Sequence, residues 1–212
     1  MLLNTMTDNE IFKEVKTDFE SYKRKRCYLL ADFGKFCKKS RVFPYTKYYE
    51  WKSPNNNILL ITFTALKRGD WDSPYEKLHA QIINNNGSCK MVAINQSGER
   101  VENLVVYSSH FFSRYRERFF NDNNISATEL FRHFINRNGS IYSGNDKKNN
   151  KTYVIMQDGI GLGEVGAFVT YVNTFITYDM LHSSQSEYIA PIHEFLTNHF
   201  NFVDFWHGNC IT

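Results

Sequence analysis

Between residues 45 and 107 the sequence consists of short apolar runs separated by turn signals, and this pattern limits the possible folds more than any other feature. The runs are rich in β-branched and aromatic residues, as β-strands are. Asn and Gly lie between them, and Asn-Gly is a typical signal of a tight hairpin. Five strands are therefore expected, at 45–51, 58–66, 78–83, 89–94 and 101–107. Because the connections are short, these strands should pair as an antiparallel meander.

Helical periodicity flanks this strand region on both sides. Thr7 and Glu10 have the spacing of a capping box, which marks the start of a helix. Apolar residues then recur at helical spacing as far as Cys37, in one helix or in two. Further helices are expected at 109–120, at 126–136 and from 184 or 191 to 200.

The order of these elements defines the expected fold. Two more strands, at 152–157 and 167–178, follow the central helices and flank a glycine-rich turn. Blocks of helix and blocks of strand thus follow one another along the chain, which is typical of the α+β class with an antiparallel sheet. A length of 212 residues suffices for one substantial core. We therefore expect one compact unit with two halves, residues 1–104 with the N-terminal helix and meander, and residues 105–212.

Composition excludes several classes of protein. Lys and Arg total 25 and Asp and Glu total 22, so the net charge is only +3 and any basic function must be local. No run approaches the roughly 20 apolar residues of a membrane span, and the first residues do not resemble a secretory signal. The four cysteines, Cys27, Cys37, Cys89 and Cys210, form no C-x-x-C pair. We expect a cytoplasmic protein with reduced thiols and no structural zinc.

The strongest candidate for chemistry is a row formed by His110, Arg114 and Arg118. At spacing i, i+4 and i+8 they lie on one stripe of the expected helix 109–120, beside its apolar stripe. Three potential cations repel one another unless something negative lies against them, and an RNA phosphate is such a group. The alternative is a solvated basic face with extended arginines.

Residues 105–181 carry a distinctive order of motifs. A His-x-x-x-Arg-x-x-x-Arg helix comes first, then Ile125-Ser126 and a second capped helix, and then strands that end near Thr174–Thr177. In this order the segment resembles a family of small domains related to the RelE and barnase type of toxin ribonuclease. Those domains are much shorter than this chain, in which about a hundred residues precede the motif.

The resemblance implies metal-free cleavage of RNA, in which the 2′-hydroxyl attacks the adjacent phosphate. Such a reaction needs an acid and a base, and histidine is the side-chain class that titrates near neutral pH, so His110 would act there. Arg114 and Arg118 would stabilise the charged phosphorane. One of three residues of the last strand would position the phosphate: Thr174, Thr177 or Tyr178. No cofactor is implied, and the expected partners are RNA and an antitoxin or other protein.

Three further patterns have ordinary explanations. Gly161-Leu-Gly-Glu-Val-Gly166 matches a dinucleotide-binding motif, but a strand-like segment follows it where a helix is required, so a hairpin turn is expected. His193 and His199 are six residues apart and point in different directions around a helix, so no metal site is expected. The basic runs 23–26 and 38–41 could follow a phosphate backbone, although nearby acids favour a solvated helix face.

Three functions remain open on the sequence. The first is a metal-independent endoribonuclease or a toxin-like RNA-binding protein centred on the His110 row. The second is a non-enzymatic interaction module that binds a partner through its aromatic-rich sheet and arginine stripe. A metallohydrolase that uses the histidines ranks below both. The deciding question is whether the His110 row meets the strand segment 174–178 at one open cleft.

Overall fold

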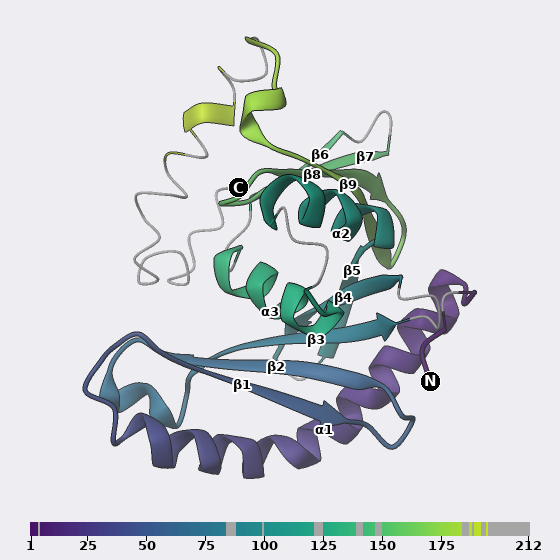
Figure 1. Cartoon of the computed structure of the whole chain (residues 1–212). Coiled ribbons are helices and arrows are strands. Elements are labelled where there is room, and N and C mark those ends of the chain that lie inside the picture. Colours follow the sequence, from purple (N-terminus) through teal and green to yellow (C-terminus); the bar gives the residue numbers. More distant parts are fainter. Residues whose placement is uncertain are drawn as a thin grey trace. The chain divides into compact units, whose positions relative to one another are not determined.

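The structure, a computed structural model of the chain, describes most residues up to 183. The described residues are 1–3, 5–83, 88–98, 100–120, 125–138, 142–146, 150–183, 187, 189–191 and 194. The chain divides into two compact units, one formed by residues 1–84 and 91–105 and the other by residues 85–90 and 106–212. Helices and a sheet of nine strands occur in separate blocks along the chain, so the predicted α+β class is confirmed (Figure 1).

The first unit begins with α1 (Asp8–Cys37), a single helix of 30 residues. Its capping box forms as predicted, because the Glu10 carboxylate accepts hydrogen bonds from the Thr7 N–H at 2.8 Å and from the Thr7 hydroxyl at 2.7 Å. Neither Gly34 nor the basic run 23–26 interrupts the helix. The sequence left open one helix or two, and the structure has one.

The meander of the first unit follows in chain order. Its strands are β1 (Tyr45–Lys52), β2 (Ile58–Ala65), β3 (Tyr75–Ile83), β4 (Cys89–Ser97) and β5 (Arg100–Tyr107). They are hydrogen-bonded in the order β1-β2-β3-β4-β5, and the pairs β1–β2 and β2–β3 are antiparallel. All five predicted strands are thus confirmed. The polar loop between β2 and β3 holds one short 3-10 helix, η1 (Arg68–Trp71).

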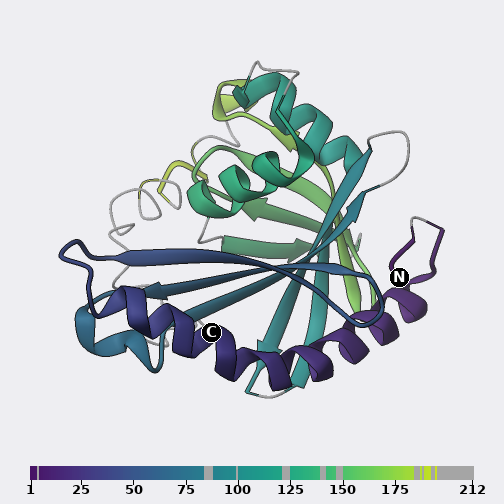
Figure 2. The same ribbon diagram turned by 60° about the horizontal axis from the view of Figure 1, so that its bottom comes forward.

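The helix α1 lies along one face of this meander (Figure 2). Aromatic rings fill the space between them, with Phe33 and Phe63 5.6 Å apart and Tyr22 and Trp51 6.1 Å apart. Tyr22, Phe33 and Phe63 are fully buried. Burial of such large apolar side chains is the main force that holds a helix to a sheet.

The second unit contains two central helical segments and four strands. The helical segments are α2 (Ser109–Tyr115), continued by the π-helix η2 (Arg116–Phe120), and α3 (Ala127–Arg137). The strands are β6 (Tyr142–Asp146), β7 (Lys151–Ile155), β8 (Ile160–Val165) and β9 (Val169–Ile176), followed by the 3-10 helix η3 (Tyr178–Met180). They are ordered β9-β8-β7-β6, and each neighbouring pair is antiparallel.

The glycine-rich segment 161–166 was predicted to be a hairpin turn, and this prediction is wrong. Most of it belongs to β8. A β-carbon on Gly163 would lie 1.7 Å from the Tyr171 carbonyl oxygen, at an irregularity in the pairing with β9. Glycine is therefore required for close approach of the neighbouring backbone and not for a turn. The turns lie on either side, closed by hydrogen bonds from Met156 N–H to Gly159 O and from Gly166 N–H to Val169 O.

Other sequence predictions have mixed outcomes. The predicted strands 152–157 and 167–178 are confirmed as β7 and β9, whereas β6 was not predicted. The Asn-Gly hairpin at 84–87 and most of the expected last helix lie outside the described residues. Within the described part of the chain, no helix combines the length and apolar character needed to cross a membrane.

Candidate functional site

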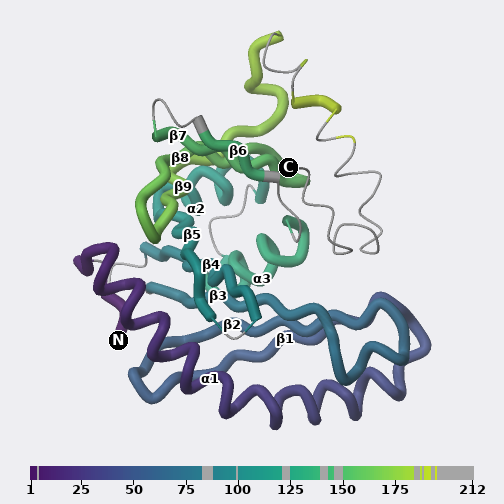
Figure 3. The backbone as a smooth tube through the Cα atoms, turned by 180° about the vertical axis from the view of Figure 1, so that it is seen from behind, coloured from purple at the N-terminus to yellow at the C-terminus, as the bar shows by residue number. Residues whose placement is uncertain are grey.

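The helix α2 is fastened to β9 at its first turn. Ser108 caps the helix, since its hydroxyl oxygen accepts a hydrogen bond from the Phe111 N–H at 3.1 Å. The same hydroxyl donates to the Asn173 carbonyl at 2.9 Å, and the Ser108 N–H donates to the Val172 carbonyl at 3.0 Å. The tube in Figure 3 shows α2 beside β9, in agreement with the contacts between these elements.

The inner side of α2 is aromatic and completely buried. Phe111 and Tyr115 are buried and pack edge-on against Phe175 of β9, with ring centres 5.7 Å and 5.1 Å away. Phe134 of α3 contacts the same two rings, at 5.5 Å and 5.4 Å. This packing fixes the rotation of α2, so residues on its other side face away from the core.

His110 and Arg114 lie on that other side. His110 is exposed, and the Arg114 side chain is 39% exposed. The Arg114 guanidinium forms an ion pair with Glu117 at 2.7 Å, a partner within its own helical segment. Glu117 is 61% exposed, so this is a surface pair of small energetic value.

Arg118 is placed differently from the sequence expectation. The predicted α-helix 109–120 becomes a π-helix after Tyr115, so the regular i, i+4, i+8 stripe does not continue to Arg118. The wider turn lets both Phe119 and Phe120 pack against Tyr115, with ring centres 5.4 Å and 6.0 Å from it. The Arg118 guanidinium donates a hydrogen bond to the Phe175 carbonyl of β9.

The predicted strand residues lie around this contact. Thr174 and Thr177 are half-buried and flank the carbonyl that Arg118 binds. The Tyr178 hydroxyl donates to the Met156 carbonyl, and burial raises the pKa of Tyr178 above its ordinary value. The structure therefore brings Arg118 to the segment 174–178, while Arg114 pairs within its own helical segment and His110 is exposed to solvent.

Sequence analysis missed a buried polar cluster centred on Asp158, in the turn between β7 and β8. Its carboxylate accepts hydrogen bonds from Tyr115 Oη at 2.7 Å, Arg137 Nε at 2.8 Å and Asn138 Nδ2 at 3.0 Å. Burial, followed by the Asp158 hydrogen bond and charge, raises the pKa of Tyr115 above its ordinary value. The cluster joins α2 and α3 to the sheet. No sequence motif indicates it, because its members are far apart along the chain.

Arg116 is a second residue that the sequence analysis missed. It begins the π-helix and is half-buried. Its Nε atom is buried and has no hydrogen-bond partner among the residues that the structure describes. Arg116 lies close enough to Cys89 to oppose the rise in the pKa of that thiol, a rise which burial causes. No sequence signal indicates Arg116, because its partly buried position depends on the π-helix, which was not predicted.

The basic run 23–26 of the first unit is partly neutralised. Arg26 donates to Glu76 at 2.6 Å, and the Tyr22 hydroxyl shares the same carboxylate. Lys23 pairs with Glu20 at 2.8 Å. These ion pairs agree with the expectation that nearby carboxylates neutralise part of the positive charge of this run.

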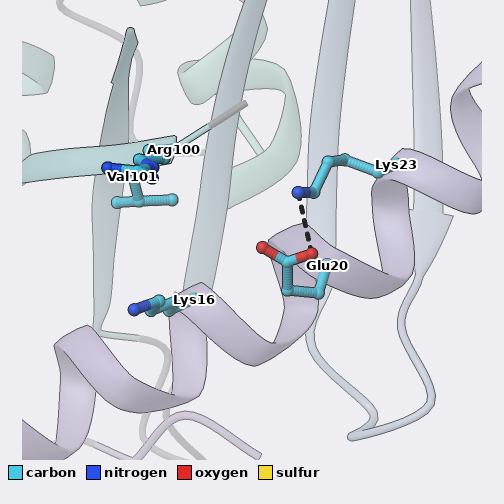
Figure 4. A pocket seen from close by; sticks show the side chains of 5 residues that line it. All are labelled: Lys16, Glu20, Lys23, Arg100 and Val101. Atoms are coloured by element: carbon cyan, nitrogen blue, oxygen red, sulfur yellow. Dashed lines mark ion pairs between the residues drawn. The ribbon is translucent and has the colours of Figure 1, made fainter. Parts of the chain in front are cut away.

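A hollow of about 470 Å³ lies beside α1 in the first unit (Figure 4). Three of its lining side chains are cationic: Lys16, Lys23 and Arg100. Glu20 and Val101 complete the lining. The surplus of positive charge suits a small anion, although the ion pair with Glu20 neutralises Lys23. The hollow contains none of the six predicted site residues.

The described residues include no group of three or more His, Cys, Asp or Glu side chains arranged to hold a metal ion. His193 and His199, with Cys210, lie outside the described part of the chain. Comparisons of the chain with protein families, with curated proteins and with solved structures find no match. The likeness to toxin ribonucleases therefore stays a prediction from the sequence.

Proposed function

We propose that this protein binds RNA and cleaves it without a metal ion at the outer side of α2. The observation that carries the proposal is the placement of His110 and Arg114. These side chains lie one helical turn apart on the solvent side of a helix that is fixed by its buried rings and by Ser108. The second unit has two helical segments followed by an antiparallel sheet, which is the order of elements that the likeness to toxin ribonucleases implies.

In this proposal His110 transfers a proton to or from the RNA, and Arg114 contacts the phosphate. A phosphate can replace Glu117 as the partner of Arg114, because an exposed ion pair contributes only about 0–1 kcal/mol. Arg118 is then a positioning residue, since its guanidinium fastens the end of the helical segment to β9. Thr177, two residues after that contact, is the proposed phosphate-positioning group, because Thr174 precedes Phe175 in β9 and points to the face of the sheet opposite to α2. We place the activity in the cytoplasm, where RNA is available.

The test is incubation of the purified full chain with a single-stranded RNA of defined sequence in excess EDTA. We expect cleavage that leaves 2′,3′-cyclic phosphate ends. The His110→Ala variant should be slower by about 10²–10⁴, the usual contribution of a general acid or base, and Arg114→Ala by about 10²–10³.

The matched control is His133→Ala, which removes an exposed histidine from the neighbouring helix α3. It should cleave at the rate of the unmodified protein. Equal loss in His133→Ala and His110→Ala, with both variants folded by circular dichroism, would remove His110 from the reaction. Unaltered RNA after prolonged incubation of the unmodified protein would end the proposal.

A protein partner is the second candidate function, and exposed apolar side chains favour it. In the second unit Leu162, Phe168 and Met180 are 38%, 49% and 47% exposed. An antitoxin or another protein could cover such residues. In this case Arg114→Ala would weaken capture of the partner while the chain itself has no effect on RNA.

A further inference from the structure

We infer that the C-terminal half of α1 is a binding surface for single-stranded RNA, an inference that rests on the proposed action on RNA. The surface, called here the α1 stripe, consists of Arg24, Tyr28, Lys35 and Lys39. The spacing of four and seven residues places Arg24, Tyr28 and Lys35 on one side of the helix, and Lys39 follows in the turn just after the last helical residue, Cys37. All four are exposed, and the side opposite to them carries the buried residues Tyr22 and Phe33.

The α1 stripe has three cations and no carboxylate. The acids nearest to it along the helix have other partners, since Glu20 binds Lys23 at 2.8 Å and Asp32 binds Lys47 at 2.6 Å. Asp32 also accepts a hydrogen bond from Tyr49, and the hydrogen bonds of Lys47 and Tyr49, with a smaller contribution from the Lys35 charge, lower the pKa of Asp32.

Among the residues that the structure describes, the ion pairs include none made by Arg24, Lys35 or Lys39. A local surplus of positive charge therefore exists in a chain whose net charge is only +3. Sequence composition already required that any basic function be local, and this stripe is such a location.

Contacts at the end of α1 hold the stripe in place. Trp71 of η1 packs so closely on Gly34 that a β-carbon there would lie 2.8 Å from its ring. The Lys38 ammonium lies 3.3 Å from the centre of the same indole, a close cation–π contact. Arg68 donates to the Ser40 carbonyl at 3.1 Å, which ties the loop to the helix end. Lys35 and Lys39 thus project from a fixed helix end.

An exposed tyrosine among cations suits a single strand of RNA. Tyr28 is 72% exposed, and the Lys25 ammonium lies 5.6 Å from its ring centre. Proteins that follow single strands combine cations for the backbone with aromatic rings on which bases stack. From Arg24 to Lys35 the stripe extends over about 16 Å of helix, which is long enough for a few nucleotides. In a duplex the bases are already stacked, so Tyr28 would have no such role.

The test measures binding separately from cleavage. The probe is a fluorescent 12-nucleotide single-stranded RNA with 2′-O-methyl groups, which removes the nucleophile of the proposed reaction. We expect the full chain to bind it with an affinity that falls as salt is raised. The Arg24→Gln/Lys35→Gln/Lys39→Gln variant should bind at least tenfold more weakly, with a slope of log Kd against log salt lower by about 2. Tyr28→Ala should bind about tenfold more weakly.

A matched control removes three exposed lysines from elsewhere: Lys13→Gln/Lys52→Gln/Lys151→Gln. It makes the same change in net charge and should lose less than about threefold in affinity, because these lysines are not part of the α1 stripe and exposed charges are screened by salt. Thermal unfolding checks each variant, and Lys39→Gln alone replaces the triple variant if the latter is unfolded. The single variant should lower the salt slope by about 0.7.

Three results would overturn the inference. The first is an equal loss of RNA affinity in the stripe variant and in the control variant. The second is that the unmodified chain does not bind the RNA. The third is an unchanged RNA affinity in Tyr28→Ala together with stripe-dependent binding to vesicles of anionic lipid. The last result would assign the stripe to a membrane surface. Failure of the proposed cleavage is recognised separately, because a chain that binds the 2′-O-methyl RNA through the stripe but leaves ordinary RNA intact is a binding protein without that activity.

Discussion

At the scale of single residues, His79 on β3 is a histidine that the fold keeps neutral. Its Nδ1 is buried without a hydrogen-bond partner among the described residues. Burial, and secondarily the charge of Lys77, lowers the pKa of His79 to about 3. An unfolded histidine titrates near 6.5, so between about pH 3 and pH 6.5 the unfolded chain binds the additional proton. The contribution of neutral His79 to the free energy of unfolding is therefore fully present above about pH 6.5 and is lost as the pH falls toward about 3.

We accordingly predict that urea unfolding at pH 5 gives a free energy about 2 kcal/mol lower than at pH 7 because of this group. In His79→Gln the difference between the two pH values should shrink by about that amount. If the unmodified chain and the variant show the same difference, the pKa assigned to His79 is wrong.

Asp158 is the residue on which the polar cluster of the second unit depends. Its side chain is 1% exposed and binds the Arg137 guanidinium at 2.8 Å. Arg137 is 43% exposed and can be hydrated once its partner is lost, so the cost comes from the hydrogen bonds to the buried carboxylate, and Asp158→Asn should lower the free energy of unfolding by about 2 kcal/mol. Glu164→Gln breaks the exposed pair with Lys151 and should cost less than about 1 kcal/mol. Similar values for the two variants would show that the cluster contributes little.

At the scale of elements, β8 depends on a glycine that no side chain can replace without moving the strand. Since a β-carbon on Gly163 would meet the backbone of Tyr171, Gly163→Ala should destabilise the protein by about 2 kcal/mol or more. Gly69→Ala is the control, because nothing lies within 4 Å of its β-carbon position, and it should change stability by less than about 0.5 kcal/mol. Chemical denaturation measures both, and a neutral Gly163→Ala would contradict the assigned strand pairing.

The elements that the sequence predicted well are those with strong local signals. The capping box of Thr7 and Glu10, the apolar repeat of α1 and the β-branched runs of β1–β5 act over a few residues, so they are visible without the fold. The strand β8 was missed because glycine favours turns locally, whereas here the close approach of β9 requires it. The π-helix was missed because it depends on Phe119 and Phe120 both packing against Tyr115.

At the scale of the whole molecule, two compact units carry different parts of the proposed function. The second unit carries His110 and Arg114, and the first carries the α1 stripe. The sequence identified His110 and Arg114 by their helical spacing alone. It could not show that Arg118 binds a carbonyl of β9 or that Glu117 pairs with Arg114, because both depend on the final positions of the side chains.

The most direct test of the proposed activity is the chemistry of RNA ends. The full chain is incubated with a 5′-labelled RNA in EDTA, and the products are treated with acid, which opens a 2′,3′-cyclic phosphate, before electrophoresis. We predict fragments whose mobility shifts after acid, and almost none with His110→Ala. RNA that stays at full length, or fragments that form equally fast with His110→Ala, would contradict the account.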